Sequence, residues 1–538
     1  MFARGISILV SSCLDAGNIP APRPGDSVAE KCAQDALRAI QTDDAFMPLS
    51  QRLQNPDAYA RIQQKRRALL ESFLWIEPNA AAMEKMLDLI VEICEESAWS
   101  ASSGFDDPSR PAIDLQAAET GVLFAWLIRR HGVRLSESSP RIQSLMVGEV
   151  RRRLLAPILA HDDYPFMNGG GHCPALILSD LLLSCVLMEQ NPHRRQQPIK
   201  LLLRLLDGLC IARSDPRASL EARVADACAI ADLARLMKRL TRGEFDLTRS
   251  MPPEGWLDDI IIAWVHGDFF VNPAGESPRP KISGMDLFRL GYLAQDRALC
   301  ALGAQLHRLR ARSGFSLSGR ILNMEYMRAA QDECAAPPRL KRASAENGSL
   351  MLSRVNTLFA ALSGTGKRAN VGDITLFSDS APILVDAGGV IHNLPLIDGC
   401  APITRPKNPP STDTDFGPER DLMSVDLTST YPEKCLLGAY QRTLMTLRSD
   451  GTVRLVDAFE FIRPAKTLTF RFVTAQKPLF LRELVRLGPV DLSWDGDMSA
   501  EIEELPEAEA FPGGCWLISF TLREVPRRFI CGFTFEQN

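Results

Sequence analysis

Long hydrophobic runs are missing from this sequence of 538 residues. No stretch approaches the 18 or more apolar residues that a membrane-spanning helix requires. The first residues, MFARGISILVSSCLDAG, contain an unbroken apolar stretch only from Ile8 to Val10. That stretch is too short for the core of a signal peptide. We therefore expect a soluble, cytoplasmic protein that has no membrane partner.

An excess of positive charge and closely spaced cysteine pairs are also missing. The net charge is −5, so the surface is not generally basic and nucleic acid is not expected as a partner. The 13 cysteines are an odd number, and they are scattered without a Cys-x-x-Cys pair. Many of them stand in apolar runs, for example Cys94, Cys185 and Cys228. This pattern indicates reduced, buried thiols rather than a disulfide framework or a zinc site.

Helical periodicity dominates the chain from about residue 28 to residue 335. The segment NAAAMEKMLDLIVEICEESAW places Met83, Met86, Leu87, Ile90 and Ile93 three or four residues apart, as on one face of a helix. Further helices are predicted over 139–159, 173–189, 197–212, 220–241, 255–266 and 296–313. Long helices with short joins favour antiparallel pairs, stacked in a solenoid or closed into a ring.

Strand-like alternation replaces the helical pattern after a polar, basic linker, CAAPPRLKRASAENGS. Segments such as TVRLVDAFEFI, LTFRFVTA and CWLISFTLREV alternate apolar and polar residues between Gly-containing turns. This pattern predicts an antiparallel β-sandwich. We expect an α+β chain of two domains, a helical domain over 1–335 and a β-sandwich over 336–538, with any cleft between them.

An ordered series of motifs resembles the heparinase II/III-like polysaccharide lyases over roughly residues 45 to 475. The helical part has EICEESAW, AIDLQAAETG, EVRRRLLAPIL, NGGGHCPALILSDLLL and HGDFFVNPAGESP, and the strand part has NVGDITLFSDSAPILVDAGG and HNLPLIDG. The resemblance implies an N-terminal (α/α) toroid followed by a C-terminal antiparallel β-sandwich. It also implies that the partner is an acidic, uronic-acid oligosaccharide or polysaccharide, which the family cleaves by β-elimination.

Beta-elimination needs a group that neutralises the sugar carboxylate, a base for the C5 proton and an acid for the leaving oxygen. In the family, a toroid Tyr acts as acid or base and a sandwich His assists. Here the segment ARSDPRASLEARVADA puts Leu220 or Glu221 about where that Tyr would stand. No Tyr occurs between Tyr164 and Tyr292, and a helix start at Ser219 explains the segment better.

The sandwich histidines of the family are replaced as well. Alignment on NVGDITLF puts Gly366, Lys367, Arg368 and Ala369 at the family's His-Asn-His-Asn, and Asn370 at its Asp. The resemblance leaves Asp386 and His392 as remnant positions of the family's metal ligands. One Asp and one His seldom hold zinc or calcium without further ligands, so we expect no metal or other cofactor.

An ion pair is the expected replacement for that metal. Arg368 would place a fixed cation where a metal-binding imidazole stood, and a guanidinium can pair with the Asp386 carboxylate without a metal. For binding an acidic sugar, the candidate residues on this side are Lys367, Arg368, Asn370 and His392.

The candidate catalytic residues of the helical part lie in and before a glycine-rich loop, MNGGGHCPA. Asn168 and His172 both lie near the position of the family's neutralising residue, and the register between them stays open. Three glycines permit close backbone approach to a ligand, although a flexible loop before a helix explains them equally well. Tyr164 and Tyr431 are the remaining candidates for the acid.

Two functional hypotheses follow, with a third behind them. The chain is an active lyase with a rearranged site, or a catalytically inactive carbohydrate-binding or regulatory relative. The missing Tyr and His favour the second. In the third, the chain is an interaction scaffold whose cleft is unused. The sequence does not specify the polysaccharide or the oligomeric state.

Overall fold

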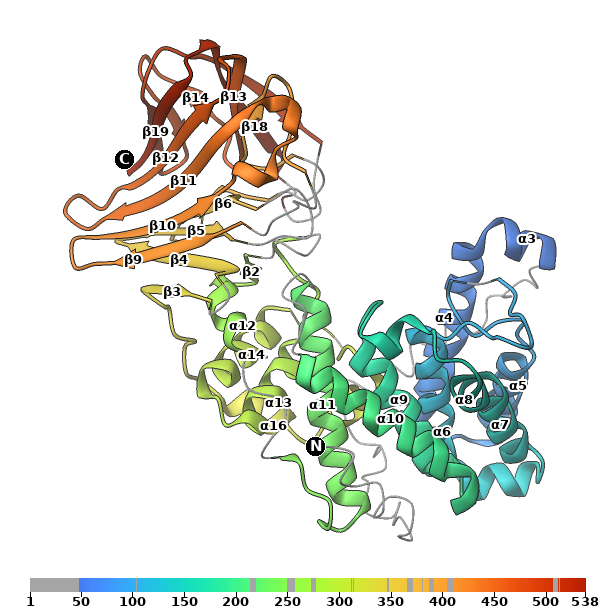
Figure 1. Cartoon of the computed structure of the whole chain (residues 1–538). Coiled ribbons are helices and arrows are strands. Elements are labelled where there is room, and N and C mark those ends of the chain that lie inside the picture. Colours follow the sequence, from blue (N-terminus) through green and yellow to red (C-terminus); the bar gives the residue numbers. More distant parts are fainter. Residues whose placement is uncertain are drawn as a thin grey trace.

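The computed structural model describes residues 48–102, 104–212, 219–248, 257–271, 277–310, 312, 314–345, 348–364, 371–379, 381–386, 391–403, 410–506, 511 and 513–538. Helices come first and antiparallel strands follow, as the sequence predicts (Figure 1). We refer to residues 48–332 as the helical half and to residues 342–538 as the sheet half. The sheets lie at one end of the molecule, next to α12 (Asp258–Ala263) and a hairpin of β1 (Trp264–His266) and β2 (Phe269–Phe270).

The helices begin where short polar side chains can cap them. The side chains of Asn79, Asp114, Ser219 and Asp296 each accept a hydrogen bond from a backbone N–H of the first turn that follows. The described α-helices are α3 (Leu49–Gln54), α4 (Pro56–Ser72), α5 (Ala80–Cys94), α6 (Leu115–Ser138), α7 (Ile142–Val150), α8 (Ala156–Ala160), α9 (Pro174–Met188), α10 (Pro192–Ala212), α11 (Leu220–Leu240), α12 (Asp258–Ala263), α13 (Gly284–Ala294), α14 (Arg297–Leu309), α15 (Leu317–Asn323) and α16 (Met327–Asp332).

No helix within the described ranges is long and apolar enough to cross a membrane. The predicted stripe of α5 is confirmed, because Met83, Met86, Ile90 and Ile93 are buried and Leu87 is half-buried. The closed ring of helix pairs stays a prediction.

A short hairpin replaces the end of the predicted helix over 255–266. After α12 the chain forms β1 (Trp264–His266), which pairs with β2 (Phe269–Phe270). Gly267 makes the turn between them with a φ of 56°, and the aromatic and β-branched residues on either side favour extended backbone. The hairpin contributes to the contact between the two halves, because the Phe269 ring lies 5.3 Å from that of Phe377 and 5.8 Å from that of Phe511.

Two large antiparallel sheets form the sheet half. One has the order β14-β15-β16-β19-β12-β11-β10-β9, and the other has the order β17-β18-β13-β7-β6-β5-β4-β3 with β8 beside β13. The strands are β3 (Arg342–Ser344), β4 (Leu350–Val355), β5 (Leu358–Ser363), β6 (Ile374–Ser378), β7 (Ala381–Leu384), β8 (Leu396–Ile397), β9 (Thr412–Phe416), β10 (Arg420–Asp426), β11 (Leu437–Leu447), β12 (Val453–Phe461), β13 (Ala465–Thr474), β14 (Leu479–Phe480), β15 (Val485–Leu487), β16 (Val490–Trp494), β17 (Ser499–Leu505), β18 (Cys515–Val525) and β19 (Arg528–Gln537).

The two sheets share one hydrophobic core. Every second residue of β12 is buried, which is the pattern of a strand with one face toward a core. The core takes Met351 and Leu376 from one sheet and Leu444 and Phe533 from the other.

A buried ion pair also joins the sheets. Arg442 of β11 lies opposite Asp457 of β12, and its Nε and Nη2 donate to the two carboxylate oxygens over 2.7 and 2.8 Å. Its Nη1 donates to the carbonyl oxygens of Gly372 and Asn393, which lie in segments next to β6 and β8 of the other sheet. Both charged side chains are almost fully buried and have lost their contact with water. Each charge is therefore stabilised mainly by the other.

Replacing Arg442 with alanine should therefore destabilise the sheet half strongly. Arg442→Ala leaves the Asp457 carboxylate buried without a cation, and we expect a loss of about 3–5 kcal/mol in the free energy of unfolding. Urea unfolding followed by circular dichroism measures the change. Arg528→Ala, which removes the exposed pair with Glu460, is the control and should change little. Equal stability of the two variants would contradict this assignment.

Candidate functional site

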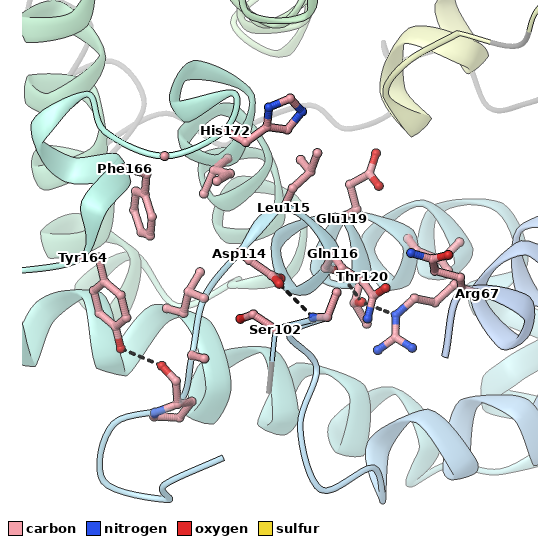
Figure 2. Close-up of a pocket in the computed structure, with 18 of the residues that line it drawn as sticks. Arg67, Ser102, Asp114, Leu115, Gln116, Glu119, Thr120, Tyr164, Phe166 and His172 are labelled. Atoms are coloured by element: carbon pink, nitrogen blue, oxygen red, sulfur yellow. Dashed lines mark hydrogen bonds between the residues drawn. The ribbon is translucent and has the colours of Figure 1, made fainter. Parts of the chain in front are cut away.

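A cavity of about 890 Å³ lies in the helical half (Figure 2). Its walls come from α4, the segment before α6, α6 itself, the segment before α9 and α15. Its charged and aromatic lining residues include Arg67, Glu71, Glu119, Tyr164, His172 and Arg320. We call it the helical pocket.

The glycine-rich loop brings two of the predicted site residues to this pocket. A single turn over Pro165–Asn168 is followed by Gly169 with a φ of 72° and Gly171 with a φ of 85°, a backbone that favours glycine. His172 follows directly and lines the pocket, and Tyr164 lines it from the other end of the loop. Asn168 is exposed and is not among the lining residues. Of the two candidates for the neutralising residue, His172 is the one that faces the cavity.

The hydroxyl of Tyr164 is already engaged. It donates to the carbonyl oxygen of Pro111 over 2.9 Å, and the ring stacks on Phe166 with centroids 5.6 Å apart. Burial raises the pKa of Tyr164 despite the nearby charge of Arg110. This phenol is therefore a poor base at neutral pH.

The arginines that line the pocket are neutralised by carboxylates of the protein. Arg320 forms a two-pronged pair with Glu71 over 2.7 and 2.6 Å. Arg110 pairs with Asp163. A uronate entering the pocket would therefore compete with carboxylates that are already in place.

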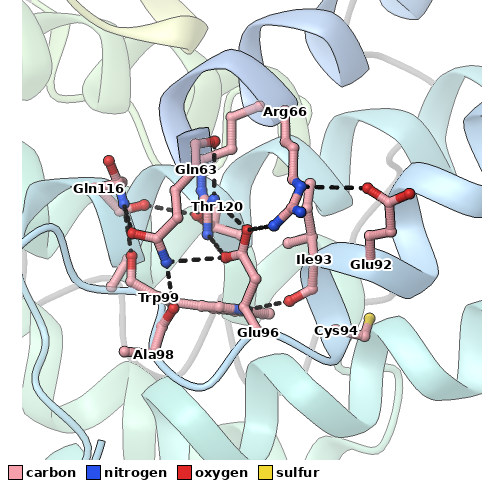
Figure 3. Close-up of polar contacts among 12 residues, drawn as sticks. Gln63, Arg66, Glu92, Ile93, Cys94, Glu96, Ala98, Trp99, Gln116 and Thr120 are labelled. Atoms are coloured by element: carbon pink, nitrogen blue, oxygen red, sulfur yellow. Dashed lines mark hydrogen bonds and ion pairs between the residues drawn. The ribbon is translucent and has the colours of Figure 1, made fainter. Parts of the chain in front are cut away.

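Arg67 is hydrogen-bonded into a buried polar network at one wall of the pocket. Figure 3 shows its partners Glu96 and Thr120 together with Gln63. Nη2 of Arg67 pairs with the buried Glu96 over 2.8 Å, and its Nε donates to Thr120 Oγ1 over 2.6 Å. Gln63 donates to Glu96 and to the carbonyl oxygen of Ala98. The network therefore fixes α4, α6 and the segment between them, and it leaves Arg67 little freedom to bind a ligand.

Glu119 is the pocket residue that sequence reasoning missed. Its Oε1 is buried and has no hydrogen-bond partner among the described residues. Burial raises the pKa of Glu119 to about 7, since the charge of Arg320 offsets burial only in part and Glu71 adds to the rise. The signal in the sequence was an acidic residue within the largely apolar segment AIDLQAAETGVLFAWL. In the structure its neighbours Ala118 and Thr120 are buried. Figure 2 shows Glu119 and His172 projecting into the same part of the cavity.

A second group of ligand-type side chains gathers in the sheet half. Nδ1 of His392 lies 3.4 Å from Asp373 Oδ2 and 3.9 Å from Asp386 Oδ1. Asp373 stands directly before β6, and Asp386 follows β7 by two residues. Burial by itself lowers the pKa of His392, but the nearby carboxylates of Asp373 and Asp386 outweigh it and the net shift of the pKa is upward.

The donor types of this cluster fit a divalent cation. One ligand atom from each of Asp373, Asp386 and His392 lies within 4.8 Å of the others, and two carboxylates with an imidazole suit zinc and similar ions. A cation held there would add positive charge and fix the orientation of the imidazole. The sequence-based expectation counted two remnant ligands and missed Asp373, the last residue of NVGD.

The remaining sequence-predicted residues lie elsewhere. Lys367, Arg368 and Asn370 fall outside the described residues, so the Arg368–Asp386 pair stays a prediction. Tyr431 is buried in the core of the sheet half, and its hydroxyl donates to the carbonyl oxygen of Pro395 over 2.7 Å. Burial raises its pKa, so this placement argues against proton transfer by Tyr431 to a bound sugar.

The expected groove shared by the two halves does not include the helical pocket. All described residues that line this pocket belong to the helical half. The Asp373–Asp386–His392 cluster instead lies beside a small hollow, lined by Asp373 and Asp386 together with Phe270 and Val271. The predicted helix start at Ser219 is confirmed, because its Oγ caps α11 and Leu220 is buried behind it.

Two solved structures share this fold. A heparinase III matches with a TM-score of 0.63 at 9% identity, covering 99% of this chain and 89% of that chain. A chondroitin AC lyase from Streptomyces coelicolor A3, solved as a tyrosine-to-alanine mutant, matches with a TM-score of 0.56 at 11% identity, covering 100% and 82%. No family model matches the sequence, and no curated protein matches it significantly. At such identities the likeness shows a polysaccharide lyase fold and leaves the activity to be tested.

We expect the cluster in the sheet half to work without a resident metal. Only three ligand residues gather there within the described ranges, one fewer than a closed structural zinc site has. The raised pKa of His392 adds to this, because a metal must compete with a proton for the ring. Protein purified without chelator should hold well under one equivalent of any divalent ion by elemental analysis. Oδ2 of Asp373 and Nδ1 of His392 are buried without a hydrogen-bond partner among the described residues, so a bound cation is the alternative outcome of the measurement.

The matched variants are Asp373→Asn and Asp379→Asn. Asp379 is an exposed carboxylate at the other end of β6, so its loss should not affect the cluster. A stoichiometric ion that is lost in Asp373→Asn and kept in Asp379→Asn would contradict the expectation.

Proposed function

We propose that this protein binds acidic, uronate-containing oligosaccharides in the helical pocket and cleaves them slowly or not at all. The fold is shared over 99% of the chain with a heparinase III. The (α/α) toroid and β-sandwich, with the loss of the family's Tyr and His, are part of this proposal. The observation that carries it is the position of His172, at the end of a glycine-rich loop and on a cavity of about 890 Å³. A cavity of this volume suits a ligand larger than one sugar ring.

The residues of the pocket fit binding better than rapid elimination. His172 is exposed and can donate to a sugar carboxylate. Tyr164 already donates its proton to Pro111, and the arginines are paired, so the developing charge at C5 would find weak stabilisation. Glu119 is the group best suited to exchange a proton near neutral pH.

Calorimetric titration with uronate oligosaccharides should show binding that weakens as salt rises, because charges near the surface are screened. The absorbance of unsaturated products should stay near the uncatalysed rate. We expect His172→Ala to lower the affinity about tenfold, which is about 1.4 kcal/mol. His193→Ala is the control, since His193 is exposed in α10 outside the pocket and should leave the affinity unchanged.

Three outcomes would count against the proposal. Rapid product formation that survives His172→Ala and Tyr164→Phe would show that a lyase site lies elsewhere. Binding that is the same in His172→Ala and wild type would show that the sugar binds outside the helical pocket. No binding across the panel would favour the scaffold.

Binding should also depend on pH through Glu119. With a pKa of about 7, this carboxyl is mostly neutral at pH 6 and can donate to a sugar carboxylate, whereas at pH 8 it is charged and repels it. The affinity should therefore rise as pH falls from 8 to 6. Glu119→Gln stays neutral over this range, so this variant should lose the pH dependence if Glu119 is its cause. A full pH dependence in Glu119→Gln would rule out Glu119 as the cause.

A further inference from the structure

A second cavity, of about 390 Å³, lies at the other end of β6 and β7 from the Asp373–Asp386–His392 cluster. It is bordered by the β4–β5 turn at Asn356 and by the β6–β7 turn at Asp379. Asp373 precedes β6 and Asp386 follows β7, so both lie at the ends of these strands that are away from the β6–β7 turn. Because β6 has five residues, the two places are about 17 Å apart along the strand. The cavity is therefore separate from the cluster.

Three of the cations that line this cavity have no carboxylate partner among the described residues. We call Arg339, Lys341 and Arg354 the basic pocket. By contrast, Arg448, which also lines the cavity, is paired with the buried Asp421. Asp379 is the one carboxylate among the described lining residues, so positive charge is in excess.

Arg354 is held in place without being neutralised. Its Nε donates to the carbonyl oxygen of Leu340 over 3.0 Å, and its Nη2 donates to that of Val265 over 2.9 Å. The guanidinium lies 4.5 Å above the Phe359 ring. Two carbonyls and a ring fix the group but leave its full charge, and Nη1 has no protein acceptor within the described part of the chain. This is a preorganised donor for an anion.

Repulsion within the cavity agrees with this geometry. Burial lowers the pKa of Arg354 to about 10, and the charge of Arg339 adds to the fall. Arg339 also lies against His266, with its Nη2 3.1 Å from Nδ1 of that ring. Burial and then the charges of Arg339 and Arg354 lower the pKa of His266. An anion would relieve the repulsion at both groups.

We propose that the basic pocket binds an oxyanion of the sulfate or phosphate-monoester type. A tetrahedral group with a double negative charge can accept from a guanidinium, an ammonium and a second guanidinium at once, whereas a single carboxylate is matched by one of them. The site would join three segments, because Arg354 already contacts Val265 of the helical half and both Arg339 and Lys341 come from the linker. The inference does not depend on what the helical pocket binds.

Titration of the whole chain with inorganic sulfate and inorganic phosphate at constant ionic strength, with chloride as the reference, tests the proposal. We expect saturable binding of at least one of the two anions. Arg339→Gln and Lys341→Gln, both at exposed positions, should each weaken it about tenfold. Arg528→Gln removes an exposed cation on β19 and should have no effect. His172→Ala should also leave it unchanged, which separates this site from the helical pocket.

A sulfated disaccharide and its unsulfated counterpart identify the source of the anion. Tighter binding of the sulfated disaccharide than of inorganic sulfate supports a sulfated chain at this site, and the reverse supports a free ion. The absence of saturable binding for both inorganic anions and the sulfated disaccharide would overturn the proposal. So would binding that persists unchanged in the Arg339→Gln, Lys341→Gln double variant.

Discussion

The arrangement of the Asp373–Asp386–His392 cluster depends on the buried ion pair between Arg442 and Asp457. Two charges inside a hydrophobic core are stable there only because each satisfies the other. Arg442 then has one nitrogen left, and it donates to the carbonyls of Gly372 and Asn393. These residues directly precede Asp373 and directly follow His392, so a pair in one sheet positions the cluster of the other.

Asn393 extends this control. Its side chain donates to the carbonyl oxygens of Ile374 and Val385 and accepts from the backbone N–H of Val473. Its own N–H donates to Oδ1 of Asp373, which leaves Oδ2 to face His392. The orientation of the Asp373 carboxylate therefore follows from backbone N–H groups that are themselves held in place.

Charge pairing distinguishes the helical pocket, the Asp373–Asp386–His392 cluster and the basic pocket from one another. In the helical pocket the arginines are paired with carboxylates, as Arg320 is with Glu71. His172 and Glu119 are the residues there that can donate a hydrogen bond to a ligand or exchange a proton with it. In the cluster, two carboxylates surround one imidazole. In the basic pocket the cations are unmatched within the described residues, as at Arg354. A chain of net charge −5 can therefore present one local site for a strongly charged anion.

The sequence was informative where the determining interactions are local. The stripe of α5, the cap at Ser219 and the alternation of β12 are properties of neighbouring residues, and the structure confirms them. The β1–β2 hairpin was missed because its stability comes from Phe377 and Phe511, more than a hundred residues away.

The site was less predictable, because it depends on which distant side chains meet. Asp373 joins Asp386 and His392 only once β6 and β7 pair. The pKa of Glu119 is raised by burial in the folded protein, next to Arg320, which lies about two hundred residues further along the chain. Tyr431 was predicted as a catalytic residue from its type, but it packs in the core of the sheet half.

The most direct test of the central claim is a crystal structure of the protein with a bound uronate tetrasaccharide. The account predicts an intact sugar in the helical pocket, with a uronate carboxylate within hydrogen-bond distance of His172 and close to Glu119. A sugar bound beside the Asp373–Asp386–His392 cluster, with the helical pocket empty, would contradict it.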